Sequence, residues 1–409
     1  MHDATNSTSG LENLGDYLRS EHDFELINEA LATLRHNPQK GEITSVAQLT
    51  TYVEALDVIR TVISALIAVP HPEAGVDEHL NKTQPLLLEH WTSIVRWMAY
   101  IIEAVPVLTS RPSEKGGLEI SSTLLLAMLA PDTEYTQALY EDRQTLHLIF
   151  SMLRMRNELG RYQNLRKGQD RPVCQMMRLL FNAVNVCPDA IIEFINGLGS
   201  KDRKAVAKSL VGRVGTFTYT GYFRLDDYES ATLNLTALIG SCTTMMRIDE
   251  TIERLLCRHN FVFECTTALS FFCMIPFAAP EVVHAQLALS SFVLASMHFP
   301  KQGQEAIRGG VFQNALRTLA AIPADGALYS AILDGVLVAL APLLTTSHCA
   351  LALQEKPLDA FTLGRARSAK SAKILDMIER LTSTSCSLFL NGSNHWLSVN
   401  MCYNLKVKI

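Results

Sequence analysis

Several signatures of enzymes are missing from this chain of 409 residues. The sequence contains no G-x-S-x-G, no H-E-x-x-H, no Walker A loop and no G-x-G-x-x-G. These motifs serve serine hydrolases, zinc proteases, nucleotide hydrolases and dinucleotide-binding enzymes, because each places a nucleophile, a metal or a phosphate in a fixed geometry. We therefore expect a protein that is not an enzyme, with no catalytic residues, no cofactor and no metal ligands.

Paired cysteines are missing as well, although the chain has nine cysteines. None of them forms a C-x-x-C pair, their number is odd, and several lie among apolar residues, as buried free thiols do. The first twenty residues also lack the apolar core of a signal peptide. Together these features predict an intracellular protein of the cytoplasm or nucleus.

Charge is sparse and slightly acidic. Charged residues make up 19% of the chain, hydrophobic residues 48%, and the formal net charge is -5. This balance allows a large core and argues against a specific nucleic-acid partner, which would favour a basic chain. The two most apolar stretches, 261–279 and 327–344, each contain an acidic residue and a proline. Buried helices are therefore favoured over membrane spans, and no membrane partner is expected.

Helical periodicity runs through most of the sequence, and no segment shows the sustained alternation of a strand. The pattern predicts helices at 16–35, 43–69, 82–105, 118–130, 132–158, 171–186, 188–196, 201–213, 227–243, 246–258, 261–274, 280–297, 302–308, 311–321, 326–341, 345–353 and 368–382. The fold class is therefore all-α.

One helical unit occurs twice, fifty residues apart. In KQGQEAIRGGVFQNALRTLAAI, residues 301–322, Gly310 can adopt the left-handed conformation that ends one helix before the next begins. Residues 252–272 match it when Asn260, the next-best residue for such a cap, is aligned with Gly310. The aligned pairs are Cys257 with Ile307, Arg258 with Arg308, Phe261 with Val311, Val262 with Phe312, Cys265 with Ala315, Leu269 with Leu319 and Phe272 with Ile322.

A spacing of forty to fifty residues is typical of armadillo or HEAT repeats, so we predict an armadillo/HEAT-like superhelix. No third copy aligns convincingly, and an irregular helical bundle is the alternative. The predicted organisation is a disordered N-terminus at 1–15, a helical region at 16–382, divided into halves at 16–165 and 171–382, and an irregular tail at 383–409.

The segment QEAIRGGVFQNALRTLAAI resembles an armadillo repeat, and HWTSIVRWMAYII, residues 90–102, resembles a tryptophan-containing helix of a family of fungal proteins. That family joins an armadillo-like helical region to a C-terminal MYND-type zinc finger that docks peptides. The resemblance covers residues 20–380. It implies a protein-binding adaptor.

The C-terminal tail departs from that family. Cys386, His395 and Cys402 are single, without the paired spacing that a tetrahedral zinc site requires. No zinc ligand can be assigned, and one alternative is a truncated member of the family that lacks the finger.

Two groups of residues are candidates for contacting a partner. Trp91 and Trp97 lie on adjoining helix faces. Core packing explains at least one of them, and the other is a candidate surface anchor. The segment 154–171 carries a basic cluster that could hold an acidic peptide, phosphate or RNA, although the solvated end of a helix followed by a polar loop is the favoured explanation. Its candidate residues are Arg154, Arg156, Arg161, Arg166 and Lys167.

The expected function is a non-enzymatic scaffold or adaptor that binds unidentified protein or peptide partners through a helical-repeat surface. An all-helical enzyme with an unrecognised site is a second alternative.

Overall fold

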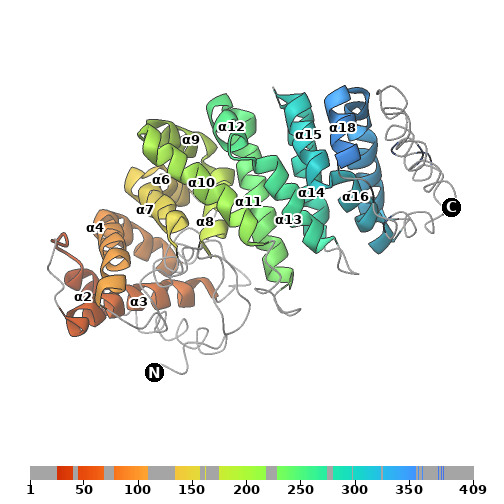
Figure 1. Cartoon of the computed structure of the whole chain (residues 1–409). Helices are drawn as coiled ribbons and strands as arrows, with labels where there is room; N and C mark the ends of the chain where they lie inside the picture. Colours follow the sequence, from red (N-terminus) through yellow and green to blue (C-terminus); the bar gives the residue numbers. More distant parts are fainter. Residues whose placement is uncertain are drawn as a thin grey trace. The chain divides into compact units, whose positions relative to one another are not determined.

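The computed structural model describes residues 25–39, 45–68, 78–108, 134–156, 162, 175–217, 228–273, 280–296, 298–323, 326–355 and five single positions beyond. Over these residues the secondary structure is helical, apart from one isolated bridge between Arg156 and Tyr162 (Figure 1). The predicted all-α class is confirmed. The predicted helices at 118–130 and most of that at 368–382 lie outside the described residues, as does the tail.

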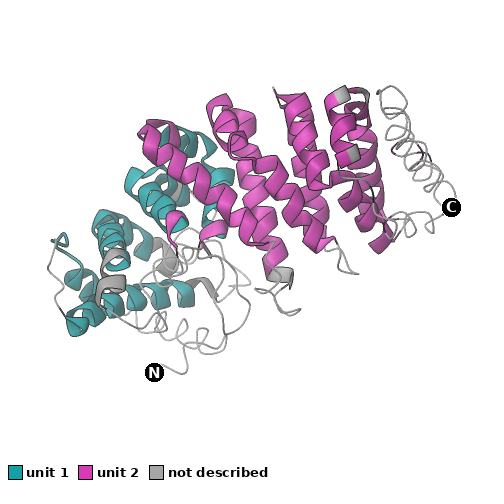
Figure 2. Cartoon of the chain, in the orientation of Figure 1, with its two compact units in different colours: residues 1–153, 178–194 teal, residues 154–177, 195–409 magenta. Residues whose placement is uncertain are grey.

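The chain forms two compact units, coloured separately in Figure 2. Unit 1 comprises Met1–Leu153 and Arg178–Phe194, and unit 2 comprises the remainder, Arg154–Met177 and Ile195–Ile409. The halves expected from the sequence, 16–165 and 171–382, stay a prediction.

Unit 1 is built from long helices in its N-terminal part. α2 (Glu25–Thr33) packs on α3 (Val46–Ala68), which packs on α4 (Glu78–Leu108). The single helix expected at 132–158 is two helices, α6 (Glu134–Glu141) and α7 (Arg143–Arg154). Asp142 separates them because its carboxylate accepts the backbone N–H of Thr145 at 2.9 Å, which caps the new helix.

The structure also contains α8 (Gln175–Val186) and α9 (Pro188–Gly197), each of which contributes residues to both units. Within unit 1, the ring of Phe194 on α9 stacks on that of Phe150 on α7, with centroids 5.3 Å apart.

Unit 2 contains two consecutive triplets of helices. After α10 (Ser200–Thr216), the first triplet is α11 (Tyr228–Ile248), α12 (Glu250–Cys257) and α13 (Phe261–Phe272). The second triplet is α14 (Pro280–Ala295), α15 (Phe299–Gly309) and α16 (Val311–Ala321). α11 packs against α14, and α13 packs against both α15 and α16, so the triplets lie side by side within the unit (Figure 1).

The two predicted caps are both left-handed. Asn260 has φ 60° and ψ 35°, and Gly310 has φ 94° and ψ 32°. They are the positive-φ residues of the described chain. The aligned apolar positions from Cys257 to Leu269 and from Ile307 to Leu319 are buried in both copies. The alignment ends at Ile322, which is half-exposed beyond the end of α16, whereas Phe272 is buried inside α13.

Gly309 has a different role from Gly310. A Cβ at Gly309 would lie 2.5 Å from the Cβ of Thr266 and 3.1 Å from the carbonyl oxygen of Phe263. The end of α15 therefore approaches the backbone of α13 more closely than a side chain allows. One glycine of the pair permits the turn, and the other permits the contact between triplets.

The stretch after α16 is not the continuous α-helix expected at 326–341. It consists of α17 (Ala327–Ile332), the π-helix η4 (Leu333–Val338) and the 3₁₀-helix η5 (Ala341–Thr345), followed by α18 (Ser347–Glu355). Ala327–Leu344 is long and apolar enough to cross a membrane by length and composition, and 44% of it is buried inside the protein. α17 and η4 both pack against α14, as core helices do.

Candidate functional site

The two candidate tryptophans lie in the core of unit 1. Trp91 is 4% exposed and donates its indole N–H to Oγ1 of Thr145 at 2.8 Å. Trp97 is fully buried and donates to the carbonyl oxygen of His36 at 2.8 Å, while its ring stacks on Tyr52 with centroids 3.8 Å apart. Packing and internal hydrogen bonds therefore account for both indoles, which corrects the expectation that one of them is exposed as an anchor for a partner.

The polar surface of α4 secures the end of α2. Ser93 donates to the carbonyl oxygen of Leu34, and Arg96 donates to the side chain of Asn37 at 2.7 Å. With the Trp97 bond to His36, three side chains of one helix bind the segment that follows α2. α4, the helix that carries both tryptophans, therefore stabilises the structure of unit 1.

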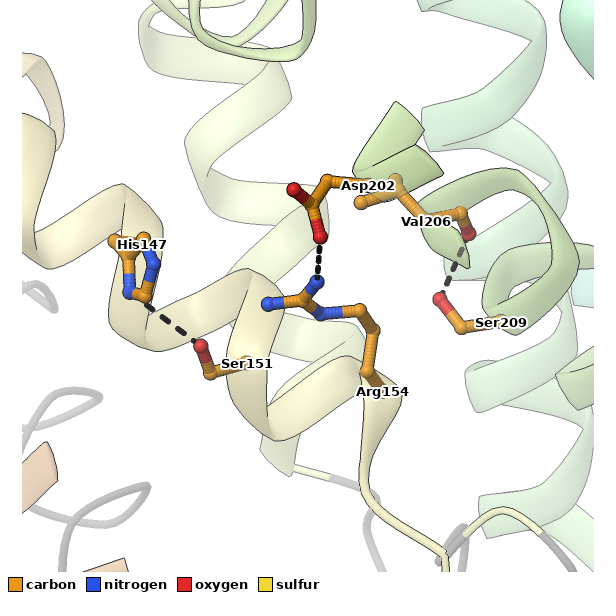
Figure 3. A network of polar contacts seen from close by, with 6 residues as sticks. All are labelled: His147, Ser151, Arg154, Asp202, Val206 and Ser209. Atoms are coloured by element: carbon orange, nitrogen blue, oxygen red, sulfur yellow. Dashed lines mark hydrogen bonds and ion pairs between the residues drawn. The ribbon is translucent and has the colours of Figure 1, made fainter. Parts of the chain in front are cut away.

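Arg154, the first basic residue of the expected cluster, is paired within unit 2. Its guanidinium donates to the carboxylate of Asp202 at 3.2 Å, from the end of α7 to the first turn of α10 (Figure 3). The other polar contacts in that view are local, from Ser209 to the carbonyl oxygen of Val206 and between Ser151 and His147. Arg154 is therefore partly neutralised, which weakens its attraction for an acidic partner.

Arg156 and Tyr162 fasten the chain after α7 onto α10. Arg156 donates to the hydroxyl of Tyr162 at 2.7 Å, and its guanidinium carbon lies 4.3 Å from the centre of the ring. The buried Arg213 lies 5.5 Å from the same centre. The ring rests on Gly212, where a Cβ would come within 2.3 Å of it. These contacts are cation–π interactions within the protein, in which the tyrosine lies near two arginines.

The remaining candidates of this segment, Arg161, Arg166 and Lys167, lie outside the described residues. The structure places the partner of Arg154, Asp202, in the first turn of α10, and the partner of Arg156, Tyr162, against Gly212 near the other end of that helix. Both arginines are committed to internal contacts.

A different group of basic residues lies on the surface of unit 2. Lys204 and Lys208 are exposed one turn apart on α10, Arg258 is exposed, and His259 is half-exposed before the left-handed cap. We call these four residues the basic surface. Burial lowers the pKa of His259, and the charges of Lys208 and Lys204 lower it further. No ion pair joins any of the four to the described part of the chain.

Sequence reasoning missed the basic surface because its members are fifty residues apart. Its halves meet because α10 packs against both α12 and α13, and Arg258 and His259 lie in the turn that joins these two helices. The available signal was the three-residue and four-residue spacing of Lys201, Lys204 and Lys208, which lies on one face of the helix.

A buried polar cluster lies where α12 meets the turn before α15. Ser296 donates to the carboxylate of Glu253, and both side chains are buried. Burial raises the pKa of Glu305. Burial and, secondly, Glu305 raise the pKa of Cys257 to about 12. Gln302 is fully buried beside them, and its amide has no nitrogen or oxygen partner in the described chain.

This cluster is poorly suited to nucleophilic chemistry. A thiol reacts as the thiolate, which a pKa near 12 suppresses. The other described cysteines, Cys187, Cys242, Cys265, Cys273 and Cys349, are also free and buried, and burial raises the pKa of each. No group of three or more His, Cys, Asp or Glu side chains among the described residues is arranged to hold a metal ion.

The candidate site that the structure offers is therefore the basic surface, formed by side chains of α10 and of the turn between α12 and α13 that have no ion-pair partner among the described residues. Comparison of the chain with models of known protein families, with curated proteins and with solved structures finds no match.

Proposed function

We propose that the protein is a non-enzymatic, intracellular scaffold whose second unit is an armadillo-like helical repeat that binds protein or peptide partners. The observation that carries this proposal is the recurrence of one unit, a helix, a left-handed cap and an amphipathic helix, at Asn260 and Gly310. In repeat proteins such units stack and expose an extended surface along the stack.

Polar contacts between the triplets support the proposal, because they fix the stacking. Asn314 on α16 donates to the carbonyl oxygen of Thr266 at 2.8 Å, and Ser270 donates to Asn314 at 2.9 Å. Asn314 is 1% exposed. A buried amide is costly unless it is hydrogen-bonded, so each triplet requires its neighbour.

A second buried contact has the same effect. Gln286 on α14 donates to Thr318 on α16 at 2.7 Å and lies 3.2 Å from the sulfur of Cys273, which follows α13. Three helices from two triplets thus meet in one hydrogen-bonded group. The arrangement favours a rigid stack over loosely joined helices.

The stack also presents matching positions on its outside. Arg258 and Arg308 each precede a left-handed cap, and both are exposed. Arg308 donates to the carboxylate of Glu355 on α18 at 2.7 Å, whereas Arg258 has no ion pair within the described residues. An outer surface that repeats with the helices suits an extended peptide, which offers side chains at regular intervals. The resemblance to zinc-finger adaptors of fungi is consistent with such a role, and it belongs to this proposal.

A library of random peptides displayed on phage and selected against the immobilised full chain tests the proposal. We expect enriched peptides that bind the chain in solution and slow hydrogen exchange of amides in α10–α16. An equal selection against the chain unfolded in urea serves as the control. Failure to enrich any peptide beyond that control, or slowed exchange in unit 1 alone, would contradict the scaffold proposal.

A further inference from the structure

We propose that the basic surface, formed by Lys204, Lys208, Arg258 and His259, binds an acidic, extended segment of a partner protein. This inference rests on the proposed scaffold function and assigns it a place and a ligand chemistry. The four residues come from α10 and from the turn between α12 and α13.

The acidic residues of the surrounding helices do not neutralise this surface. Asp202 of α10 accepts from Arg154, and Glu250 of α12 pairs with Arg254. Glu253 of α12 is buried and accepts from Ser296. Asp249, which caps α12, accepts from the backbone N–H of Ile252 and from the side chain of Asn196. Glu264 of α13 is half-buried, and burial raises its pKa. The two lysines and the arginine therefore retain an unbalanced positive field, and His259, whose pKa is lowered, contributes a neutral ring that can donate a hydrogen bond.

The positive charge is confined to the basic surface, which favours a short acidic peptide over a long nucleic acid as the ligand. The whole chain is acidic, with a formal net charge of -5, so a long nucleic acid would meet repulsion beyond the basic surface. At physiological ionic strength the screening length is about 8 Å, which is comparable to the separation of neighbouring members of the surface. A short acidic segment fits within this range.

Spacing indicates an extended ligand. Lys204 and Lys208 are four residues apart on a helix, a rise of about 6 Å along the axis. Alternate residues of an extended chain are separated by about 6.5–7 Å and point to the same side. A peptide with Glu or Asp at every second position can therefore place successive carboxylates over the two lysines.

Fluorescence anisotropy on the full chain tests this inference. The probe is a labelled peptide with Glu at alternate positions, and its counterpart carries Gln instead. We expect the Glu peptide to bind, its affinity to fall as salt is raised, and the Gln peptide to bind at least about tenfold more weakly. The double variant K204E/K208E should weaken binding of the Glu peptide by about tenfold or more, because two attractions become repulsions.

The matched control is R35E/R143E. Arg35 and Arg143 are exposed residues of unit 1, and their reversal changes the net charge of the chain by the same amount. The control should bind the Glu peptide as the unaltered chain does. K204Q/K208Q, which removes charge without adding any, should give an intermediate affinity and shows that a loss is not due to misfolding.

Three results would overturn the inference. They are the absence of Glu-peptide binding, an equal loss in the two charge-reversed variants, and tighter binding of a single-stranded oligonucleotide than of the Glu peptide. The scaffold proposal fails separately, through the peptide library. Selected peptides that protect other helices of unit 2 would leave the scaffold in place and remove only the acidic ligand.

Discussion

Replacing Gly310 with alanine measures what the left-handed cap contributes. The nearest heavy atoms to a new Cβ there lie 3.7–3.9 Å away, so the side chain meets no obstacle. The cost comes from the backbone alone, since φ is 94° and an L-residue in the left-handed region loses about 1–2 kcal/mol. Part of this loss is offset because alanine restricts the unfolded chain, which leaves a net destabilisation of about 1 kcal/mol.

Gly309→Ala is the informative comparison, because its cost is steric. Its Cβ would lie 2.5 Å from a side-chain atom of Thr266 and 3.1 Å from a backbone oxygen of α13, and backbone cannot rotate away. Overpacking of this kind costs about 1–3 kcal/mol, so this variant should be the less stable of the two. Asn260→Gly should lie within about 0.5 kcal/mol of the unaltered chain, because relief of strain and gain of unfolded-state freedom oppose each other.

Urea unfolding followed by circular dichroism gives these differences as shifts of the midpoint, with the slope unchanged. Hydrogen exchange of α15 and α16 shows whether the loss is local to the cap. A midpoint for Gly310→Ala equal to that of the unaltered chain would refute the assigned role of the left-handed turn. A Gly309→Ala variant more stable than Gly310→Ala would refute the close contact between triplets.

Three further predictions follow from burial. Trp97→Phe should lower the free energy of unfolding by about 1–3 kcal/mol, measured by urea titration, because the carbonyl of His36 loses its donor. Glu305 has a pKa raised by burial, so its stabilising contribution is complete at acidic pH and is lost as pH rises through the raised pKa. Glu305→Gln should therefore raise the melting temperature at pH 7 and change it less at pH 4. Cys242 and Cys265 should react with a thiol reagent only after unfolding, as peptide mass spectrometry can show, since burial raises both pKa values.

The helical class and both left-handed caps could be predicted because each depends on local sequence. Apolar residues at three- and four-residue steps define a helix, and glycine or asparagine after such a run identifies its end. The break at Asp142 was missed because the apolar pattern continues across it, and only the cap hydrogen bond to Thr145 shows that a new helix begins there.

The burial of the tryptophans and the assembly of the basic surface depend on contacts between residues that are far apart in the sequence. Trp91 and Trp97 carry the same pattern whether they face solvent or the core, and the bonds to Thr145 and His36 come from residues fifty or sixty positions away. Lys204 and His259 likewise become neighbours only through the packing of α10 on α12 and α13. Tertiary contacts between distant segments have no signature in one sequence.

Because Gly309 lies so close to Thr266, a substitution at one of these positions changes which residues the other position can tolerate. The contact leaves no room for a Cβ on both helices, because the second one would lie 2.5 Å from the first. A glycine at position 266 removes the shortest of the contacts that a side chain at position 309 would make, and leaves the contact of 3.1 Å with the carbonyl oxygen of Phe263. That contact is relieved if the triplets move apart and give up the bond from Asn314 to Thr266. We expect the two positions to vary together in descendants of this chain, with glycine exchanged between one triplet and the next.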